Sequence, residues 1–339
     1  MANYKGIKGF SIQSLSSDPS NLAQGEIWYN TTSNTLKGFA NIGASWASGG
    51  NVNTARSGAG CSAGTTSAGL IANGGGPSPA ADEQNTEIYD GSTWTQTGHT
   101  TNSNKTLAAQ TGTSTAAFIF GEAVACDSYN GTTWSNPGND VNTARVGGGG
   151  GGGPGGQTSS LWGGGYQVPI ATRANITEEY DGSTWTEVGD MNTARLYQGC
   201  ASGTPQTTAL EFGGQSGVPP TPSTDCLSIT EQWNGTGWTE VGDMNTGRRE
   251  MGSFGTNTGA FAVGGMTLPG LAFTAKVEQY NGTAWTEVQD MTTTRSYSMC
   301  AGTSTEAFSA SGTLAPSAKS SVTEEWADPT YAALTFTSS

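Results

Sequence analysis

Polar and apolar residues alternate in short runs, and these runs recur in the same order about every 48 residues. Each unit begins with small residues and continues with an apolar stretch ending in glycine. An aromatic residue, a tight turn and a tryptophan follow. The apolar stretches include 70–75, 210–214 and 261–265. Short runs bounded by Gly and Asn are typical of β strands rather than helices. The pattern predicts four short strands in each unit, named a to d in chain order.

A tryptophan opens the last strand of each unit. These residues are Trp46, Trp94, Trp134, Trp185, Trp238 and Trp285. In most units an aromatic residue and Asp-Gly or Asn-Gly precede the tryptophan, as at 89–91 and 280–282. Both dipeptides tolerate positive φ and are strong hairpin signals. One four-stranded sheet cannot bury both of its faces, whereas sheets packed radially cover one another. We therefore expect these tryptophans in the core between sheets.

A basic motif separates consecutive units. It reads Asn-Thr-Ala-Arg at 53–56, 142–145 and 192–195, and Asn-Thr-Gly-Arg at 245–248, with weaker copies at 102–105 and 292–295. Together with the glycine, aromatic and tryptophan positions, this motif resembles the kelch repeat over residues 50–326. The resemblance implies an all-β, kelch-like β-propeller. The turn between aromatic residue and tryptophan is shorter here than is usual in that family.

The interpretation of the N-terminal segment, residues 1–52, decides the number of blades. We favour seven blades, with degenerate strands at 10–15, 26–30, 35–39 and 45–48 forming the first. The alternative is six blades, made by the six kelch-like repeats within 53–339, preceded by a virion-attachment hairpin. Residues 18–39 resemble a hairpin motif of tailed-phage fibre and structural proteins. In either arrangement we expect residues 326–336 to supply the strand pair that closes the ring.

The strand order places the basic motifs and the b–c loops on one side of the sheets, here called the top side. The b–c loops vary in length, and variable loops on a rigid scaffold often carry function. Six cations are candidate ligand-binding residues: Arg56, Lys105, Arg145, Arg195, Arg248 and Arg295. They could form a ring that binds a carboxylate, sulfate or phosphate group of a glycan, but their repetition at an equivalent position in every unit favours a structural role.

The alternative for these cations is structural: each pairs with a carboxylate such as Glu87, Glu178, Glu278 or Glu324 and joins neighbouring strands. Two aromatic residues of the top loops, Tyr166 and Phe273, are further candidates, because their rings could stack on sugars.

Charge and composition exclude several classes of function. The chain of 339 residues has 13 Lys and Arg against 27 Asp and Glu, a net charge of −14. Nucleic-acid binding requires the opposite sign, and an anionic membrane surface would repel the chain. No apolar run is long enough for membrane insertion, and no signal peptide is evident. His99 is the only histidine, and no C-x-x-C pair occurs. We therefore expect no catalytic residues, no metal and no cofactor.

These observations predict a non-enzymatic virion structural protein of a tailed phage, a component of the tail fibre, tail tip or capsid surface. We expect synthesis in the host cytoplasm and display of the propeller for binding a host-surface glycan or protein. Residues 1–52 would contact other virion structural proteins, and a homo-oligomer is compatible with this class. One alternative is a cellular kelch-type protein-interaction scaffold, which predicts apolar top loops. The other is a propeller glycan depolymerase, which requires convergent carboxylates in a cleft.

Overall fold

The computed structural model describes residues 12–20, 25–58, 61–75, 84–102, 107–121, 124–151, 156–167, 170, 172–204, 207–216, 225–328 and 330–336. Regular elements in these ranges are β strands, and none is a helix that could cross a membrane. The chain divides into two compact units. Unit 1 comprises residues 1–44 and 327–339, and unit 2 comprises residues 45–326.

Unit 2 contains six four-stranded sheets among the described residues, each with strands a to d adjacent in that order. The first three sheets are β5 (Cys61–Thr65), β6 (Ala68–Ala72), β7 (Asn85–Tyr89) and β8 (Trp94–His99); β9 (Ala109–Thr113), β10 (Ala116–Phe120), β11 (Asp127–Tyr129) and β12 (Trp134–Ser135); and β14 (Gly149–Gly151), β15 (Ser160–Gly163), β18 (Thr177–Tyr180) and β19 (Trp185–Glu187).

The other three sheets repeat the arrangement. They are β20 (Gly199–Thr204), β21 (Thr208–Phe212), β22 (Thr230–Trp233) and β23 (Trp238–Glu240); β25 (Gly252–Thr256), β26 (Gly259–Val263), β29 (Val277–Tyr280) and β30 (Trp285–Glu287); and β31 (Met299–Gly302), β32 (Glu306–Ala310), β35 (Thr323–Ala327) and β4 (Ser45–Ser48). The sixth sheet thus takes its d strand from the N-terminal part of the chain.

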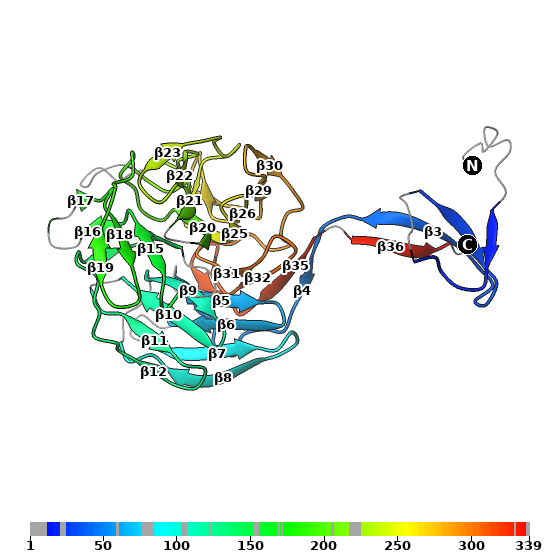
Figure 1. Ribbon diagram of the computed structural model, residues 1–339, viewed down its shortest axis with the longest axis horizontal. Coiled ribbons are helices and arrows are strands. Elements are labelled where there is room, and N and C mark those ends of the chain that lie inside the picture. Colours follow the sequence, from blue (N-terminus) through cyan, green and yellow to red (C-terminus); the bar gives the residue numbers. More distant parts are fainter. Residues whose placement is uncertain are drawn as a thin grey trace. The chain divides into compact units, whose positions relative to one another are not determined.

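The six sheets of unit 2 form a closed ring. Their a strands contact one another in the order β5, β9, β14, β20, β25 and β31, and β31 contacts β5. Figure 1 shows the sheets arranged around a common centre with these strands innermost. This closed arrangement of small antiparallel sheets is a β-propeller-like fold, as the sequence predicts.

Aromatic and aliphatic side chains fill the spaces between adjacent sheets. Trp94 of the first sheet packs on Phe308 of the sixth at a ring-centroid distance of 5.5 Å. Its indole nitrogen donates a hydrogen bond of 3.0 Å to Thr323 Oγ1. The d-strand tryptophans are only 5–7% exposed, so the prediction that they lie in the core is confirmed.

Unit 1 is a separate sheet of β1 (Gln13–Leu15), β2 (Ile27–Asn30), β3 (Thr35–Ile42) and β36 (Thr330–Thr335). Strand β1 runs parallel to β2, and the other pairs are antiparallel. The expected strands at 26–30 and 35–39 therefore do not belong to a first sheet of the ring, and only 45–48 enters unit 2. The described residues correspond to the six-sheet alternative rather than to the seven-sheet arrangement.

Ring closure also differs from the expectation. The c strand of the sixth sheet is β35, and the strand beside it is β4. The last described strand, β36, pairs with β3 in unit 1 instead. The expected c–d pair at 326–336 is therefore divided between the two units, because β4 already occupies the d position of the sixth sheet.

Short strands form three further small sheets on the top side. The d–a connection pairs with the b–c loop of the sheet it enters. This pairing confirms that both kinds of connection share one side. The added strands are β13 (Arg145–Val146), β16 (Tyr166–Gln167) and β17 (Thr172–Arg173); β24 (Arg248–Arg249), β27 (Met266–Thr267) and β28 (Ala272–Phe273); and β33 (Thr313–Leu314) and β34 (Ala318–Lys319).

Candidate functional site on the top side

The motif arginines are buried ion-pair partners. Five of the six predicted cations lie in the described residues, and all five side chains are 0% exposed. They form the pairs Arg56–Glu87, Arg145–Glu178, Arg195–Glu231, Arg248–Glu278 and Arg295–Glu324. Lys105 lies outside the described residues. Each glutamate stands on the c strand of the sheet that the motif enters.

The rest of the motif completes the same hydrogen-bond network. In the third sheet, Arg145 Nη2 donates to Glu178 Oε1 at 2.9 Å, and Nη1 donates to the carbonyls of Gly164 and Ile176, each at 2.6 Å. The Asn142 amide N–H donates to Glu178 Oε2 at 2.8 Å. Its side-chain nitrogen donates to the carbonyl of Trp185 at 2.8 Å. The network joins the incoming d–a connection to the b–c loop, the c strand and the d strand.

The candidate ligand-binding ring of motif cations is therefore not found for Arg56, Arg145, Arg195, Arg248 and Arg295. A guanidinium without exposure cannot reach a solvent ligand, and its Nη donors are engaged by glutamate and carbonyl oxygens. The Nε atoms of Arg145, Arg195, Arg248 and Arg295 are buried without a hydrogen-bond partner among the described residues. The structural alternative, pairing with a c-strand carboxylate, is what these residues show. Burial favours it, because an unpaired buried guanidinium is strongly destabilising.

The two aromatic residues predicted as ligand contacts lie on different small sheets of the top side. Tyr166 lies on β16 opposite Arg173 of β17, and Phe273 lies on β28 opposite Met266 of β27. Both side chains are half-buried. The structure thus leaves each ring partly accessible on the top side, but from different sheets.

Backbone hydrogen bonds connect the d–a connections of neighbouring sheets on the top side. The residues two positions after the motif cations are joined from sheet to sheet. Gly147 N donates to Leu107 O at 3.0 Å, Tyr197 N to Gly147 O at 2.7 Å, and Glu250 N to Tyr197 O at 3.0 Å. Tyr297 N then donates to Glu250 O at 2.7 Å, and Gly58 N to Tyr297 O at 3.4 Å.

Four of these positions carry side chains, Leu107, Tyr197, Glu250 and Tyr297. We call the last three, which share positive φ, the axial cluster. Their φ angles are 60°, 57° and 52°, in the left-handed region that bulky residues rarely adopt. Backbone strain of this kind is concentrated at functional sites in proteins. The rings of Tyr197 and Tyr297 meet edge to face at 5.6 Å. The axial cluster is therefore the best candidate functional site in the described part of unit 2.

The electrostatics of the axial cluster reflect its burial. Desolvation raises the pKa of Glu250, of Tyr197 and of Tyr297. The Tyr297 hydroxyl lies within hydrogen-bonding reach of the Tyr197 hydroxyl and the Glu250 carboxylate. All three side chains keep partial exposure. Two hydroxyl groups and a carboxyl group thus meet at the end of the axis, where they can donate and accept hydrogen bonds.

Sequence reasoning missed the axial cluster, although a signal was present. It lies at a constant offset of two residues from the motif cation, where two other repeats have Gly58 and Gly147 and one has Leu107. Large side chains at a position that elsewhere needs glycine mark a place where strain is tolerated. The arginine repeats from unit to unit, whereas the residue two positions later does not, so a search for repeats does not find it.

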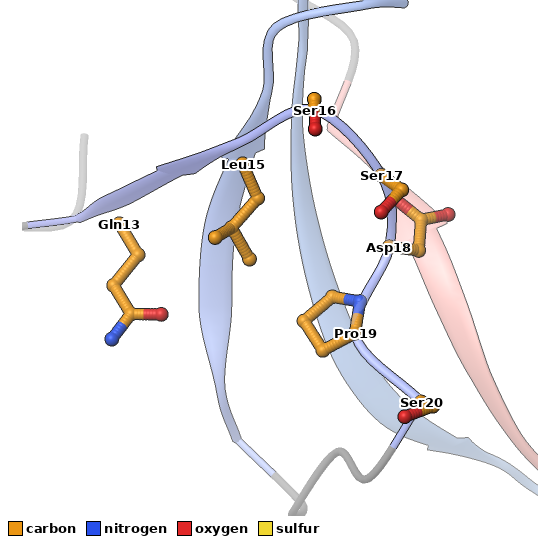
Figure 2. Close-up of a pocket in the computed structure, with 7 residues that line it drawn as sticks. All are labelled: Gln13, Leu15, Ser16, Ser17, Asp18, Pro19 and Ser20. Carbon is orange, nitrogen blue, oxygen red and sulfur yellow. The ribbon is translucent and has the colours of Figure 1, made fainter.

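An open pocket belongs to unit 1. It has a volume of about 520 Å³. Its lining comes from β1 and the following loop, residues 13–20 (Figure 2). Asp18 in this loop accepts hydrogen bonds from Lys37 Nζ at 2.7 Å, Asn30 Nδ2 at 2.7 Å and Trp28 Nε1 at 3.0 Å. These bonds, led by the one from Lys37, lower the pKa of Asp18 to about 2. Asp18 thus anchors the loop to β2 and β3.

No protein-family model and no curated protein matches the sequence. Among solved structures, the chain is similar to one titled "Structure of YjhT", with a TM-score of 0.63 and 11% sequence identity. The likeness covers 80% of this chain and 95% of that chain. At this identity the similarity concerns the fold alone. It agrees with the closed ring of small sheets in unit 2 and supports the β-propeller-like fold of the chain.

Proposed function

We propose that the chain is a non-enzymatic structural protein of a tailed-phage virion that displays its propeller to bind a host-surface glycan or protein. The observation that carries the proposal is the way in which the two units are connected along the chain. Unit 1 is built from the segments on both sides of unit 2, through the pairing of β3 with β36. Both covalent connections of the propeller therefore lead into unit 1, as suits a module held by an attachment unit.

Two sequence resemblances support the binding role of the propeller and its attachment to a virion. The repeats resemble kelch repeats, whose propellers commonly serve as binding modules. Residues 18–39, which include β2 and part of β3, resemble a hairpin of phage fibre and structural proteins. In this proposal unit 1 contacts other virion proteins, and the top side of unit 2 faces the host. The axial cluster and the half-buried rings of Tyr166 and Phe273 are the side chains that would meet a receptor.

The test is the location of the protein together with its binding to cells. Quantitative mass spectrometry and immunogold labelling of purified particles should find the chain in a fixed ratio to the major virion proteins. Purified full-length chain should also adsorb to host cells. Absence from particles, with the chain remaining in the infected-cell lysate, would refute the virion role. Release of reducing ends from host polysaccharide by the purified chain would instead support the depolymerase alternative.

A further inference from the structure

Two arginines outside the motif lie beside the axial cluster. Arg173 is on β17 of the third sheet, and Arg249 is on β24 of the fifth. They come from opposite sides of Tyr197, which belongs to the connection into the fourth sheet. Both guanidinium groups interact electrostatically with the Tyr197 hydroxyl, and they repel each other. Arg173, Arg249 and Tyr197 therefore belong to one cluster of polar and charged side chains.

The guanidinium of Arg173 has an unused donor. Its Nε donates to the carbonyl of Gln215 at 3.3 Å. Its Nη1 is buried and has no hydrogen-bond partner in the described part of the chain. Burying a charged donor without a partner costs free energy, so such groups are normally satisfied by protein, water or ligand. A ligand would have to approach Arg173 through the rest of its guanidinium, since the side chain as a whole is only half-buried.

Arg249 is the second arginine beside the axial cluster, and its side chain is largely buried. Its side chain is 10% exposed, and its Nε lies 3.5 Å from Glu250 Oε1. Asp225 is the acidic group that interacts with Arg173, and it already accepts hydrogen bonds from Ser216 N at 2.9 Å and Ser216 Oγ at 2.6 Å. Two carboxylates thus offset most of the local positive charge. On a chain of net charge −14, the site suits a monoanion better than a doubly charged phosphate.

We propose that Arg173 and Arg249 bind the carboxylate of an acidic sugar, with the hydroxyl groups of Tyr197 and Tyr297 contacting the same sugar. A planar carboxylate matches the fork of guanidinium N–H donors, and such pairs are strong and directional. The neighbouring tyrosine hydroxyls donate and accept hydrogen bonds, as sugar hydroxyls require. This inference rests on the glycan-binding form of the proposed function and narrows it to acidic glycans.

The first experiment compares acidic glycans with neutral counterparts that differ only in the carboxylate. The full-length chain is applied to an array in which each glucuronate-, galacturonate- or other sugar-acid-containing glycan is paired with its neutral form. Sulfated and phosphorylated glycans are included. We expect binding only to carboxylate-bearing members. Equal binding of neutral partners, a preference for sulfate or phosphate, or no binding of any acidic glycan would overturn the inference.

The second experiment measures affinity by calorimetry with the best acidic glycan. Arg173→Gln should weaken binding at least tenfold, and Arg173→Lys should recover only part of the loss, because lysine keeps the charge but not the fork. The matched control is Lys276→Gln, which removes an exposed cation paired with Glu287 on the outer part of the fifth sheet. It should bind as the wild type. Unchanged affinity of folded Arg173→Gln would contradict the site, and circular dichroism verifies folding.

The two proposals fail in distinguishable ways. If the chain is present in virions and adsorbs to host cells but binds no acidic glycan, the virion role stands and the acidic-sugar site is wrong. If it binds acidic glycans through Arg173 but is absent from particles, the site stands and the virion role is wrong.

Discussion

The motif arginine is a structural residue that pairs with a buried glutamate and donates to backbone carbonyls. In each of the five described pairs, the glutamate also accepts backbone N–H groups of the incoming connection, as Glu231 does from Asn192 at 2.7 Å and Thr193 at 3.2 Å. A buried pair of this kind is costly to break, because the remaining charge stays buried without compensation. The repeated motif thus stabilises the connections between sheets.

Replacement of one partner measures this role directly. Arg195→Met keeps the length of the side chain but leaves Glu231 unpaired in a site that is 0% exposed. We expect the free energy of unfolding to fall by about 3–5 kcal/mol, as measured by urea denaturation followed by tryptophan fluorescence. The control Lys276→Met removes an exposed ion pair and should leave the denaturation midpoint unchanged. Similar curves for both variants would contradict the structural role.

Strand b of the fourth sheet contains one unusual element, a buried acidic residue between two sheets. Glu211 stands at the position that Ile71 occupies in the first sheet and Ile119 in the second. Its carboxyl group fits against glycines of the third sheet. A Cβ added to Gly163 would lie 2.4 Å from Glu211 Oε1, and one added to Gly149 would lie 2.7 Å from its Cδ. Glycine on both strands therefore makes room for this side chain.

Stability should depend on pH through this residue. Burial raises the pKa of Glu211 to about 7, above the value of an unfolded chain. Below about pH 4.5 the carboxyl group is protonated in both states. As the pH rises towards 7, the unfolded chain ionises first, so the free energy of unfolding falls by about 3 kcal/mol.

The matched variant for this prediction is Glu211→Gln, which keeps the shape and remains neutral. Thermal denaturation at pH 5 and pH 8 should show a smaller pH dependence for this variant than for the wild type. At pH 8 the variant should be the more stable of the two. An equal pH dependence would show that Glu211 does not titrate in this range.

At the scale of elements, the repeat pattern predicts the strands of the repeated units but not the strands in the loops between them. The tryptophans, the hairpin turns and the glycine-ended strands have local signatures, so strands a to d could be placed from the sequence. The accessory strands such as β16 and β17 could not, because their loops share no pattern between repeats. The axial cluster depends on contacts among three sheets, and only the closed ring brings those residues together.

At the scale of the whole molecule, two strands could not be assigned from sequence because their partners are distant. Strand β4 joins the sixth sheet and β36 joins unit 1, and neither pairs with its neighbour in the chain. Short polar strands such as Ser45–Ser48 carry little register information of their own. Their assignment follows from closure, which leaves no unpaired edge on the last sheet.

Because the chain forms two compact units, we expect each unit to have its own free energy of unfolding. Trp28 of unit 1 is 2% exposed, and Trp46 of unit 2 is 7% exposed. Each replacement by alanine should cost about 3–5 kcal/mol in its own unit. Hydrogen exchange followed by mass spectrometry should show faster exchange in β2 and β3 for Trp28→Ala. For Trp46→Ala, the acceleration should fall on β35 and β32. Acceleration across both units in either variant would show that they unfold as one.

The construction of the sixth sheet imposes an order on synthesis. Strand β4 leaves the ribosome early, but β35, beside which it must lie, follows about 275 residues later. At roughly 10 residues per second, this interval is about half a minute. During that time Trp46 has no sheet to join, and the nascent ring stays open at one edge. A chain released before β35 is made would leave β4 and the edge of the open ring unpaired in solution. Complete translation is therefore itself a condition for a soluble propeller.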